Sequence, residues 1–408
     1  MPRKTARQGL ASDTGRALQG DVEHGYGPVG DAFMRHFKEK RELGAAAAAY
    51  VEGRKVVDLW AGLADRRSQR LWAKDTAQLV FSASKGVLTI CALQLVEHGA
   101  LDLDAPVGRY WPEFATAGKK DIRVRWLLSH RAGLALLDAR PSVKDIASWP
   151  TMIRLLENQR PQWQPNSGHA YHAMTFGWLV GELVHRVSGL LPGEYLRTFV
   201  AEPLELEMWF GVPTELLARL ARVEVAPDKW TRSGTRASLD QSSMVDDRAV
   251  RAVTLNGALL LPITGVTRAL DWNRVDVQQA QIPAGNLVST ARSLAKLYAA
   301  SIGEVDGKRA LSAGTVADAV LEQSVGPPVF GLEPGDPGPR WGSGFQLYSP
   351  PSRPMLGPHS FGHYGAGGQL GFADTESKVG FGYITNLLNG TVDDRANHLV
   401  DALRECLG

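Results

Sequence analysis

The chain of 408 residues is 44% hydrophobic and 22% charged with a net charge of +2, a composition typical of a globular protein with a large core. So small a net charge gives no reason to expect a nucleic acid or an anionic membrane surface as a partner. Two cysteines, Cys91 and Cys406, exclude a disulfide framework, and no stretch approaches the roughly 18 apolar residues of a membrane span. The basic N-terminus lacks the apolar run of a secretory signal, so a cytoplasmic location is expected.

The first elements in chain order are an arm, a helix and a hairpin. Residues 1–25 are polar and are expected to be loosely ordered. In the segment VGDAFMRHFKEKREL, Val29, Phe33 and Phe37 recur every four positions, which predicts an amphipathic helix. Two strand-like runs then flank Glu52-Gly53-Arg54, which predicts a β-hairpin.

The middle of the chain is mainly helical, and its C-terminal part returns to strands. From Ser84 to about Ser188 helical patterns alternate with loops, whereas 226–281 shows only an exposed polar loop, KWTRSGTRASLDQSS. Strand patterns occur in WGSGFQLY, GGQLGFAD and KVGFGYITN, and Thr391 is the expected N-cap of a final helix. Strands at both ends with helices between them predict an α+β fold, in which both ends of the chain build one antiparallel sheet. The expected parts are a sheet-containing domain of residues 26–84 and 283–408, and a mainly helical inserted domain of residues 85–282.

A serine and a lysine stand three positions apart where FSASKGVLTICALQLVEHG passes from small polar residues into an apolar helix. Positions i and i+3 share one helix face, roughly 5–6 Å apart at Cβ, so the Lys85 amine is expected within reach of the Ser82 hydroxyl. The start of a helix also offers free backbone N–H groups, which favour an alkoxide-like nucleophile. A lysine in apolar surroundings can lose its proton or lower the pKa of a neighbouring base.

The same spacing also fits a serine N-cap followed by a solvated lysine. A second copy, Ser293 to Lys296 in ARSLAKLY, lies in an amphipathic pattern that predicts an exposed lysine.

The Ser-x-x-Lys spacing therefore indicates catalysis only together with other segments that could complete an active site. Tyr171, in a loop before an apolar helix, is the first, and the stretch SFGHYGAGGQLGFAD is the second. Five glycines in a strand region are costly unless the backbone approaches something closely, such as a substrate.

The order Ser82 to Lys85, Tyr171, and His363-Tyr364-Gly365 resembles the order S-x-x-K, Y-x-N, and K-T-G or H-T-G of the serine beta-lactamase and penicillin-binding superfamily. The resemblance extends from about Val29 to the end. VVDLWAGLADRR, LLSHRAGL and PAGNLVSTARSLAKLY look like the class C branch, and YHAMTFGWLVGEL and FGHYGAGGQLGFAD look most like family VIII carboxylesterases. The resemblance implies an α/β/α sandwich around the antiparallel sheet, with the helical domain inserted.

The resemblance also implies a serine hydrolase that acts on a small-molecule ester through an acyl-enzyme, with no cofactor. Ser82 would be the nucleophile and Tyr171 the general base, its phenol pKa lowered by Lys85, although whether Lys85 or Tyr171 is the primary base stays open. The oxyanion hole would be the backbone N–H groups of Ser82 and Ala366. Substrate binding would involve His363, Tyr364 and Gly365. No feature of the sequence indicates an oligomeric state.

Two departures from the motifs argue against a beta-lactam or peptidoglycan substrate. Ala173 stands where Y-x-N has its asparagine, and His363 stands where K-T-G has a lysine suited to a substrate carboxylate. Short uncharged esters are therefore the expected substrates. The alternatives are an acyltransferase that passes the acyl group to an alcohol or amine, a beta-lactamase or DD-peptidase, and a non-catalytic binding protein.

Two histidine pairs have spacings that occur in metal sites. His169 and His172 are three residues apart, and His359 and His363 are four apart. Neither pair comes with a suitably spaced acid in a convincing helix, so no metal is expected.

Overall fold

The computed structural model describes residues 17–226, 246–259, 271–331, 338–389 and 393–408. Its largest element is a sheet of eight strands in the order β1-β3-β2-β12-β11-β10-β9, with β4 paired to β3, and all its neighbouring strands are antiparallel. The strands are β1 (Gln19–Val22), β2 (Gly44–Val51), β3 (Arg54–Asp65), β4 (Arg70–Leu71), β9 (Gln346–Leu347), β10 (Ser360–Gly365), β11 (Gln369–Asp374) and β12 (Val379–Thr385). Because β12 pairs directly with β2, both ends of the chain build one sheet, as predicted.

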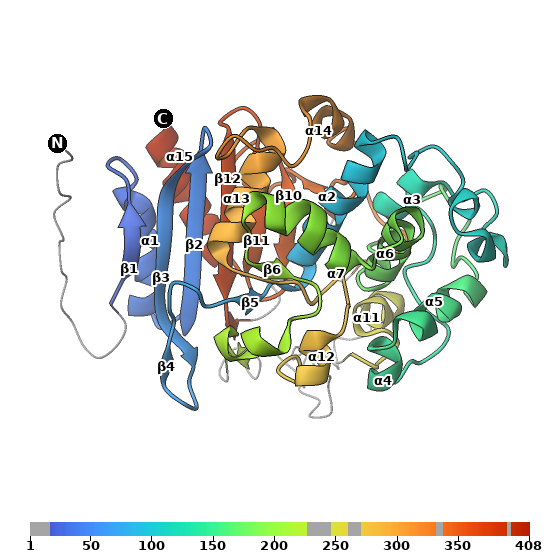
Figure 1. Cartoon of the computed structure of the whole chain (residues 1–408), viewed down its shortest axis with the longest axis horizontal. Coiled ribbons are helices and arrows are strands. Elements are labelled where there is room, and N and C mark those ends of the chain that lie inside the picture. Colours follow the sequence, from blue (N-terminus) through green and yellow to red (C-terminus); the bar gives the residue numbers. More distant parts are fainter. Residues whose placement is uncertain (1–16, 227–245, 260–270, 332–337, 390–392) are drawn as a thin grey trace.

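Helices cover both faces of this sheet (Figure 1). One face carries α1 (Gly27–Lys38) and α15 (Arg395–Leu407), and the other carries α13 (Ala291–Ile302) and α2 (Ser84–Glu97). The predicted amphipathic helix is α1, which buries Val29, Phe33 and Phe37 against the sheet. This arrangement is the α/β/α sandwich expected from the sequence.

Strand β2 shows why both faces are covered. Its sequence, GAAAAAYV, is buried along almost its whole length. Ala45, Ala47 and Ala49 belong to the core under α1 and α15, whereas Ala46 and Ala48 belong to the core under α13 and α2. Successive side chains of a strand point to opposite faces, so a run of small apolar residues suits a strand that helices cover on both sides.

The chain between α2 and β8 is mainly helical and lies beside the sheet (Figure 1). Its helices are η2 (Val107–Arg109), η3 (Pro112–Ala115), α3 (Val124–Leu128), α4 (Val143–Ile146), α5 (Trp149–Asn158), α6 (Thr175–Ser188), α7 (Pro192–Tyr195), η4 (Leu196–Ala201), α8 (Glu202–Leu204), η5 (Thr214–Arg219), α11 (Asp247–Thr254) and α12 (Val275–Gln279). Further along the chain, the stretch LSAGTVADAVLEQ contains α14 (Ala313–Ala319), with Ser312 as its N-cap. The domain boundaries themselves stay a prediction.

Two small sheets connect distant parts of the chain. The first is antiparallel and has the order β5 (Gln78–Leu79), β8 (Val288–Ser289) and β6 (Met208–Trp209). The second pairs β7 (Glu224–Val225) in parallel with β13 (Leu387–Leu388). Since β5 leads directly into the turn that contains Ser82, the first small sheet fixes the approach to that turn.

Three expectations differ from the structure or lie outside it. The arm is not loose at Gln19–Val22, where β1 pairs with β3 and so satisfies backbone groups at the edge of the sheet. In WGSGFQLY only Gln346 and Leu347 form a strand, β9. Thr391, the whole predicted polar loop KWTRSGTRASLDQSS and residues 1–16 lie outside the described residues, and the last helix has Asp394 as its N-cap.

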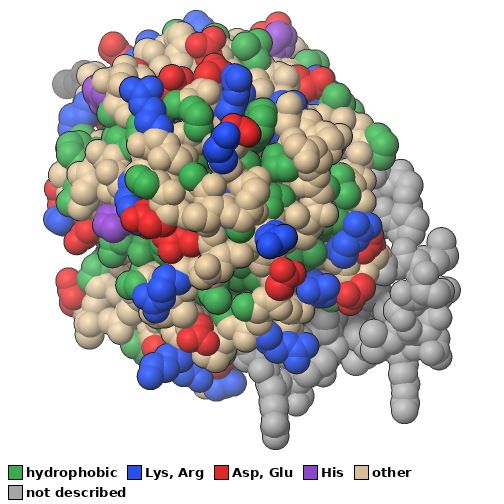
Figure 2. All heavy atoms as spheres, turned by 90° about the vertical axis from the view of Figure 1, so that its right-hand side faces the viewer, with side chains coloured by type: hydrophobic (Ala, Val, Ile, Leu, Met, Phe, Trp, Pro, Cys, Tyr) green, Lys and Arg blue, Asp and Glu red, His purple; other side chains and the backbone are tan. Residues whose placement is uncertain are grey.

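Figure 2 shows the end of the molecule that carries the helices, where acidic and basic side chains intermingle with apolar ones. None of the helices in the described ranges has both the length and the apolar character that crossing a membrane requires.

Candidate active site

Ser82 lies in a 3₁₀ turn, η1 (Phe81–Ala83), immediately before α2. Phe81 has a φ of 49°, a left-handed conformation that is uncommon for a residue other than glycine. The Ser84 hydroxyl holds this conformation because it donates to the Phe81 carbonyl and accepts from the Leu287 N–H at 3.0 Å. The turn therefore presents a half-buried Ser82 side chain in a fixed position.

Lys85 is completely buried in the first turn of α2 and contacts Ser82, as predicted. Its Nζ lies 3.2 Å from the Ser82 Oγ and donates to the Ala284 carbonyl at 2.9 Å. No ion pair joins Lys85 to a carboxylate in the described part of the chain. Burial among apolar residues lowers the pKa of Lys85 well below its usual value. The structure thus places an amine that favours its neutral form beside a serine hydroxyl.

The Ala284 carbonyl, which accepts the hydrogen bond from Lys85, belongs to the loop PAGN, Pro283 to Asn286. The Asn286 side chain accepts from the Ile282 N–H at 2.9 Å and donates to the Val277 carbonyl at 3.0 Å. This amide fixes the loop and hence the position of the Ala284 carbonyl. This segment resembles the class C branch in sequence, but no local pattern in it indicates that its carbonyl binds Lys85.

Tyr171 reaches the same point from the loop before α6. The Lys85 Nζ lies 4.9 Å from the centre of the Tyr171 ring, and the Trp341 ring stacks on Tyr171 with centroids 5.4 Å apart. Burial raises the pKa of Tyr171, and the nearby Ser82 hydroxyl offsets only part of this shift. The expectation that Lys85 lowers this pKa is therefore wrong, and the phenol keeps its proton. Its hydroxyl makes no well-directed hydrogen bond among the described residues.

Two buried histidines hold the loop on both sides of Tyr171. The His130 carbonyl accepts a hydrogen bond from the Ala170 N–H, and the His130 Nδ1 accepts one from the His172 N–H, both at 3.2 Å. His172 donates from Nδ1 to the Ala170 carbonyl at 2.8 Å and accepts at Nε2 from the Leu134 N–H at 3.0 Å. Burial lowers the pKa of His130 well below its usual value and that of His172 to about 4, so both are neutral. His172 thus uses both ring nitrogens in the loop rather than in a metal site.

Strand β10 brings His363 to the site but turns Tyr364 away from it. The buried His363 ring lies 6.1 Å from the Tyr171 ring, its Nδ1 is 2.6 Å from the Tyr364 carbonyl, and burial lowers the pKa of His363 well below its usual value. The Tyr364 hydroxyl donates instead to Asn397 of α15 at 2.8 Å. Adjacent residues of a strand point to opposite faces, so the Tyr364 side chain faces α15 and only its backbone lies on the side of the site. The role predicted for Tyr364 in substrate binding stays a prediction. His359 lies at the surface, 3.7 Å from Glu376.

The end of β10 lies directly against the turn that contains Ser82. A Cβ added to Gly365 would meet the Val80 carbonyl oxygen at 2.3 Å and the Ala83 nitrogen at 3.2 Å, so only glycine permits this approach. The next residue is Ala366, whose N–H donates to no backbone carbonyl in the described part of the chain. A nucleophile, a buried amine, a protonated phenol and a free backbone donor together suit acyl transfer.

The second S-x-x-K copy, on α13, is more buried than predicted. Ser293 is 5% exposed, and the Lys296 side chain is 12% exposed and pairs with Asp306 at 2.8 Å. The expectation of an exposed Lys296 is wrong because α13 packs against the sheet on one side and is covered by neighbouring segments on others.

The beta-lactamase family model matches residues 31–405, and the chain therefore belongs to the beta-lactamase family and is a serine hydrolase. Among its relatives, Esterase/beta-lactamase LipL of Mycobacterium tuberculosis is 33% identical over 384 residues, which are 92% of this chain and 84% of LipL. The crystal structure of a family VIII carboxylesterase has a TM-score of 0.82 and 31% identity, over 95% of this chain and 99% of that one. A penicillin-binding protein homolog from Caulobacter crescentus has a TM-score of 0.80 and 30% identity, over 95% and 99%. The resemblance predicted from the motifs is confirmed.

Proposed function

We propose that this protein is a carboxylesterase that hydrolyses small esters through an acyl-enzyme on Ser82. The observation that carries the proposal is the completely buried Lys85 amine, 3.2 Å from the Ser82 Oγ and without an acidic partner among the described residues. The similarity to LipL and to a family VIII carboxylesterase supports an ester as the substrate.

In the first step the neutral Lys85 amine accepts the Ser82 proton while the Ser82 Oγ forms a bond to the ester carbonyl carbon. The electron pair of the carbonyl moves to its oxygen, and the backbone N–H groups of Ser82 and Ala366 would bind the resulting oxyanion. A single donor of this kind typically contributes about 10²–10³ in rate. The low pKa of Lys85 makes it the better base of the two open alternatives, since Tyr171 keeps its proton.

In the second step the oxyanion collapses and the bond to the leaving alcohol breaks. Tyr171 would donate its phenolic proton to the alcohol oxygen, and the Lys85 ammonium would return a proton to Tyr171. Water then attacks the acyl carbon of the acyl-enzyme, and Lys85 accepts a proton from that water. The bond to the Ser82 Oγ breaks, the Lys85 ammonium returns the proton to Ser82, and the carboxylic acid leaves. Attack by an alcohol or amine instead of water would give the alternative, acyl transfer, from the same intermediate.

The two departures from the penicillin-recognising motifs support short uncharged esters as substrates. Ala173 is buried and its methyl group offers no hydrogen bond, while His363 is neutral and offers no charge for a substrate carboxylate. A polar substrate group that loses its partner costs about 1–3 kcal/mol. The cytoplasmic location expected from the sequence stays a prediction that cell fractionation can check.

The test compares Ser82→Ala with Ser293→Ala as a matched control. We expect Ser82→Ala to abolish hydrolysis of p-nitrophenyl butyrate and labelling by a fluorophosphonate probe, and Ser293→Ala to retain both. Mass spectrometry that placed the probe on Ser293, or equal losses in the two variants, would contradict the proposal. Product analysis with added methanol or an amine separates hydrolysis from acyl transfer, and a wild-type protein that takes no probe would favour a binding protein.

A further inference from the structure

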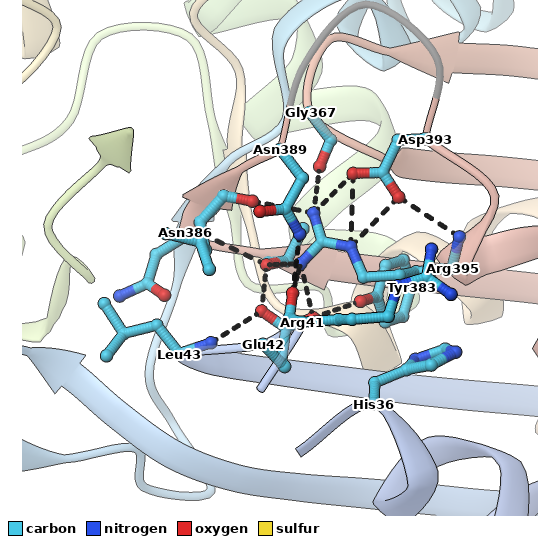
Figure 3. Close-up of polar contacts among 12 residues, drawn as sticks. His36, Arg41, Glu42, Leu43, Gly367, Tyr383, Asn386, Asn389, Asp393 and Arg395 are labelled. Carbon is cyan, nitrogen blue, oxygen red and sulfur yellow. Dashed lines mark hydrogen bonds and ion pairs between the residues drawn. The ribbon is translucent and has the colours of Figure 1, made fainter. Parts of the chain in front are cut away.

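Arg395 is completely buried and is the first residue of α15, which covers the sheet face opposite to that of α2. Figure 3 shows its polar contacts. Its guanidinium donates to Glu42 at 2.8 Å and to Asp393 at 2.9 Å, and both carboxylates are buried too. Each guanidinium nitrogen has at least one acceptor, and the remaining acceptors are the Arg41 carbonyl, the Thr385 hydroxyl, the Gly367 carbonyl and the Leu387 carbonyl. A fully paired charge of this kind holds its neighbours in one geometry.

One of these contacts fixes the turn between β10 and β11. The Arg395 Nη2 donates to the Gly367 carbonyl at 2.9 Å, and Gly367 directly follows Ala366 (Figure 3). Gly368, with a φ of 94°, leaves room for Asp393: a Cβ at Gly368 would lie 2.8 Å from the Asp393 carboxyl carbon. The turn that carries the Ala366 N–H therefore lies directly on the Arg395–Asp393 pair.

A second set of contacts extends from the same cluster toward Ser82. The Thr385 hydroxyl bonds to both Arg395, at 3.3 Å, and Glu42, at 2.6 Å. The Thr385 carbonyl accepts from the Gln369 side chain at 2.7 Å and from the Gln78 side chain at 3.2 Å. Gln78 belongs to β5, which leads into the Ser82 turn, and Gln369 begins β11. One buried polar cluster is thus bonded to both chain segments that supply the oxyanion donors.

We propose that Arg395 is a positioning residue for the oxyanion hole, which sets the spacing between the Ser82 and Ala366 N–H groups through the Gly367 carbonyl and through Thr385 and Gln78. This inference rests on the proposed acyl-enzyme chemistry. A lysine at this position keeps the charge but lacks the planar fork, so it cannot hold both carboxylates and the Gly367 carbonyl together. A misplaced donor weakens transition-state binding more than substrate binding.

The experiment compares Arg395→Lys with Arg292→Lys. Arg292 forms a bidentate pair with the buried Asp58 at 2.8 and 3.0 Å, on the opposite sheet face, and no contact of its side chain reaches the described turn. We expect Arg395→Lys to lower kcat for p-nitrophenyl butyrate about 10²-fold with KM changed less than about threefold. Arg292→Lys should lower Tm comparably and leave kcat within about twofold of wild type.

A second readout does not depend on turnover. Phenylboronic acid accepts the Ser82 oxygen at boron, and one oxygen of the tetrahedral adduct occupies the oxyanion hole. We expect calorimetry to give a Kd for this probe that rises in Arg395→Lys in parallel with the loss of kcat, but is unchanged in Arg292→Lys. If Arg395→Lys does not fold, Gln78→Leu decides the question, because it removes the contact to Thr385 without touching the charges, and should lower kcat about 3–10-fold.

An unchanged kcat and an unchanged boronate Kd in Arg395→Lys, or in Gln78→Leu where the first variant does not fold, would overturn the inference. Equal kcat losses in Arg292→Lys would overturn it as well, since they would show a general effect of stability. A wild-type protein that hydrolyses no ester contradicts the proposed function instead, and the boronate Kd then decides this inference alone. A wild-type protein that neither hydrolyses esters nor binds the boronate overturns both.

Discussion

The spacing Ser-x-x-Lys occurs twice, and the surroundings of the two serines differ. The Ser293 Oγ accepts from the Glu207 N–H at 2.7 Å and bonds to the Thr290 hydroxyl at 2.9 Å, so it serves the start of α13 and a neighbouring segment. The Ser82 Oγ has only the Lys85 amine as a well-directed partner among the described residues, and Ser82 is half-buried rather than buried. Only Ser82 retains a free oxygen that can reach a substrate.

The two lysines of the motif copies also differ in their partners. Lys296 pairs with the Asp306 carboxylate at 2.8 Å, and such a partner favours the charged ammonium. Lys85 has a hydroxyl and a carbonyl as partners, and its burial disfavours the charge. On the proposed mechanism, the motif therefore provides a base only where the lysine is buried without a counter-ion.

The largest expected effect comes from removing the Lys85 amine, with removal of the Lys296 amine as the matched control. Lys85→Met should lower kcat for p-nitrophenyl butyrate about 10²–10⁴-fold, because the methionine fills a similar volume but accepts no proton. Lys296→Met should leave kcat within about twofold, since it removes an ion pair with a mostly exposed aspartate. Comparable losses in the two variants would show that the surroundings do not decide which lysine acts.

Tyr171→Phe should have the next largest effect, about 10²-fold or more on kcat, because the leaving alcohol then receives no proton from the phenol. If Lys85 and Tyr171 act in one proton-transfer unit, the double variant Lys85→Met/Tyr171→Phe should be little worse than the more damaging single one. Steady-state kinetics of the four proteins provides the cycle. Additive losses would assign the two residues to independent roles.

Substrate preference should be a smaller effect. With the polar contacts at Ala173 and His363 missing, each costing a beta-lactam about 1–3 kcal/mol, kcat/KM for nitrocefin should be at least about 30-fold below that for p-nitrophenyl butyrate. Acetate and butyrate esters should be hydrolysed readily. Similar kcat/KM values for nitrocefin and the butyrate ester would instead indicate that a beta-lactam is a natural substrate.

The smallest expected effect is that of pH. A base acts when it is unprotonated, so activity falls as the pH drops below the pKa of that base. Since burial lowers the pKa of Lys85 well below its usual value, kcat/KM should level off between pH 7.5 and 9 instead of rising throughout that range. A lysine with an ordinary pKa would instead give a rise of about tenfold per pH unit. The rate of Ser82→Ala gives the spontaneous hydrolysis to subtract.

The sequence predicted the parts of the site that depend on local spacing and motif order. Helical geometry alone placed Lys85 beside Ser82, and strand alternation could have shown that His363 and Tyr364 face opposite ways. The pKa of Tyr171 is raised because the ring is buried, in part under Trp341. Trp341 is far from Tyr171 in the chain, so no local sequence pattern indicates this burial. The completely buried Arg395 also has no local signal, because its sequence surroundings, TVDDRANHL, suggest an exposed helix start.

The pairing of β12 with β2 has a consequence for how the protein becomes active during its synthesis. The Ser82 turn leaves the ribosome early, whereas β10, the Ala366 turn and Arg395 belong to the last part of the chain. Contacts between segments so distant in sequence form late, since a long loop must close before they stabilise anything. On the proposed mechanism, an incomplete chain therefore carries Ser82 without the groups that would stabilise an oxyanion. We therefore expect activity to begin only when the C-terminal strands have joined the sheet.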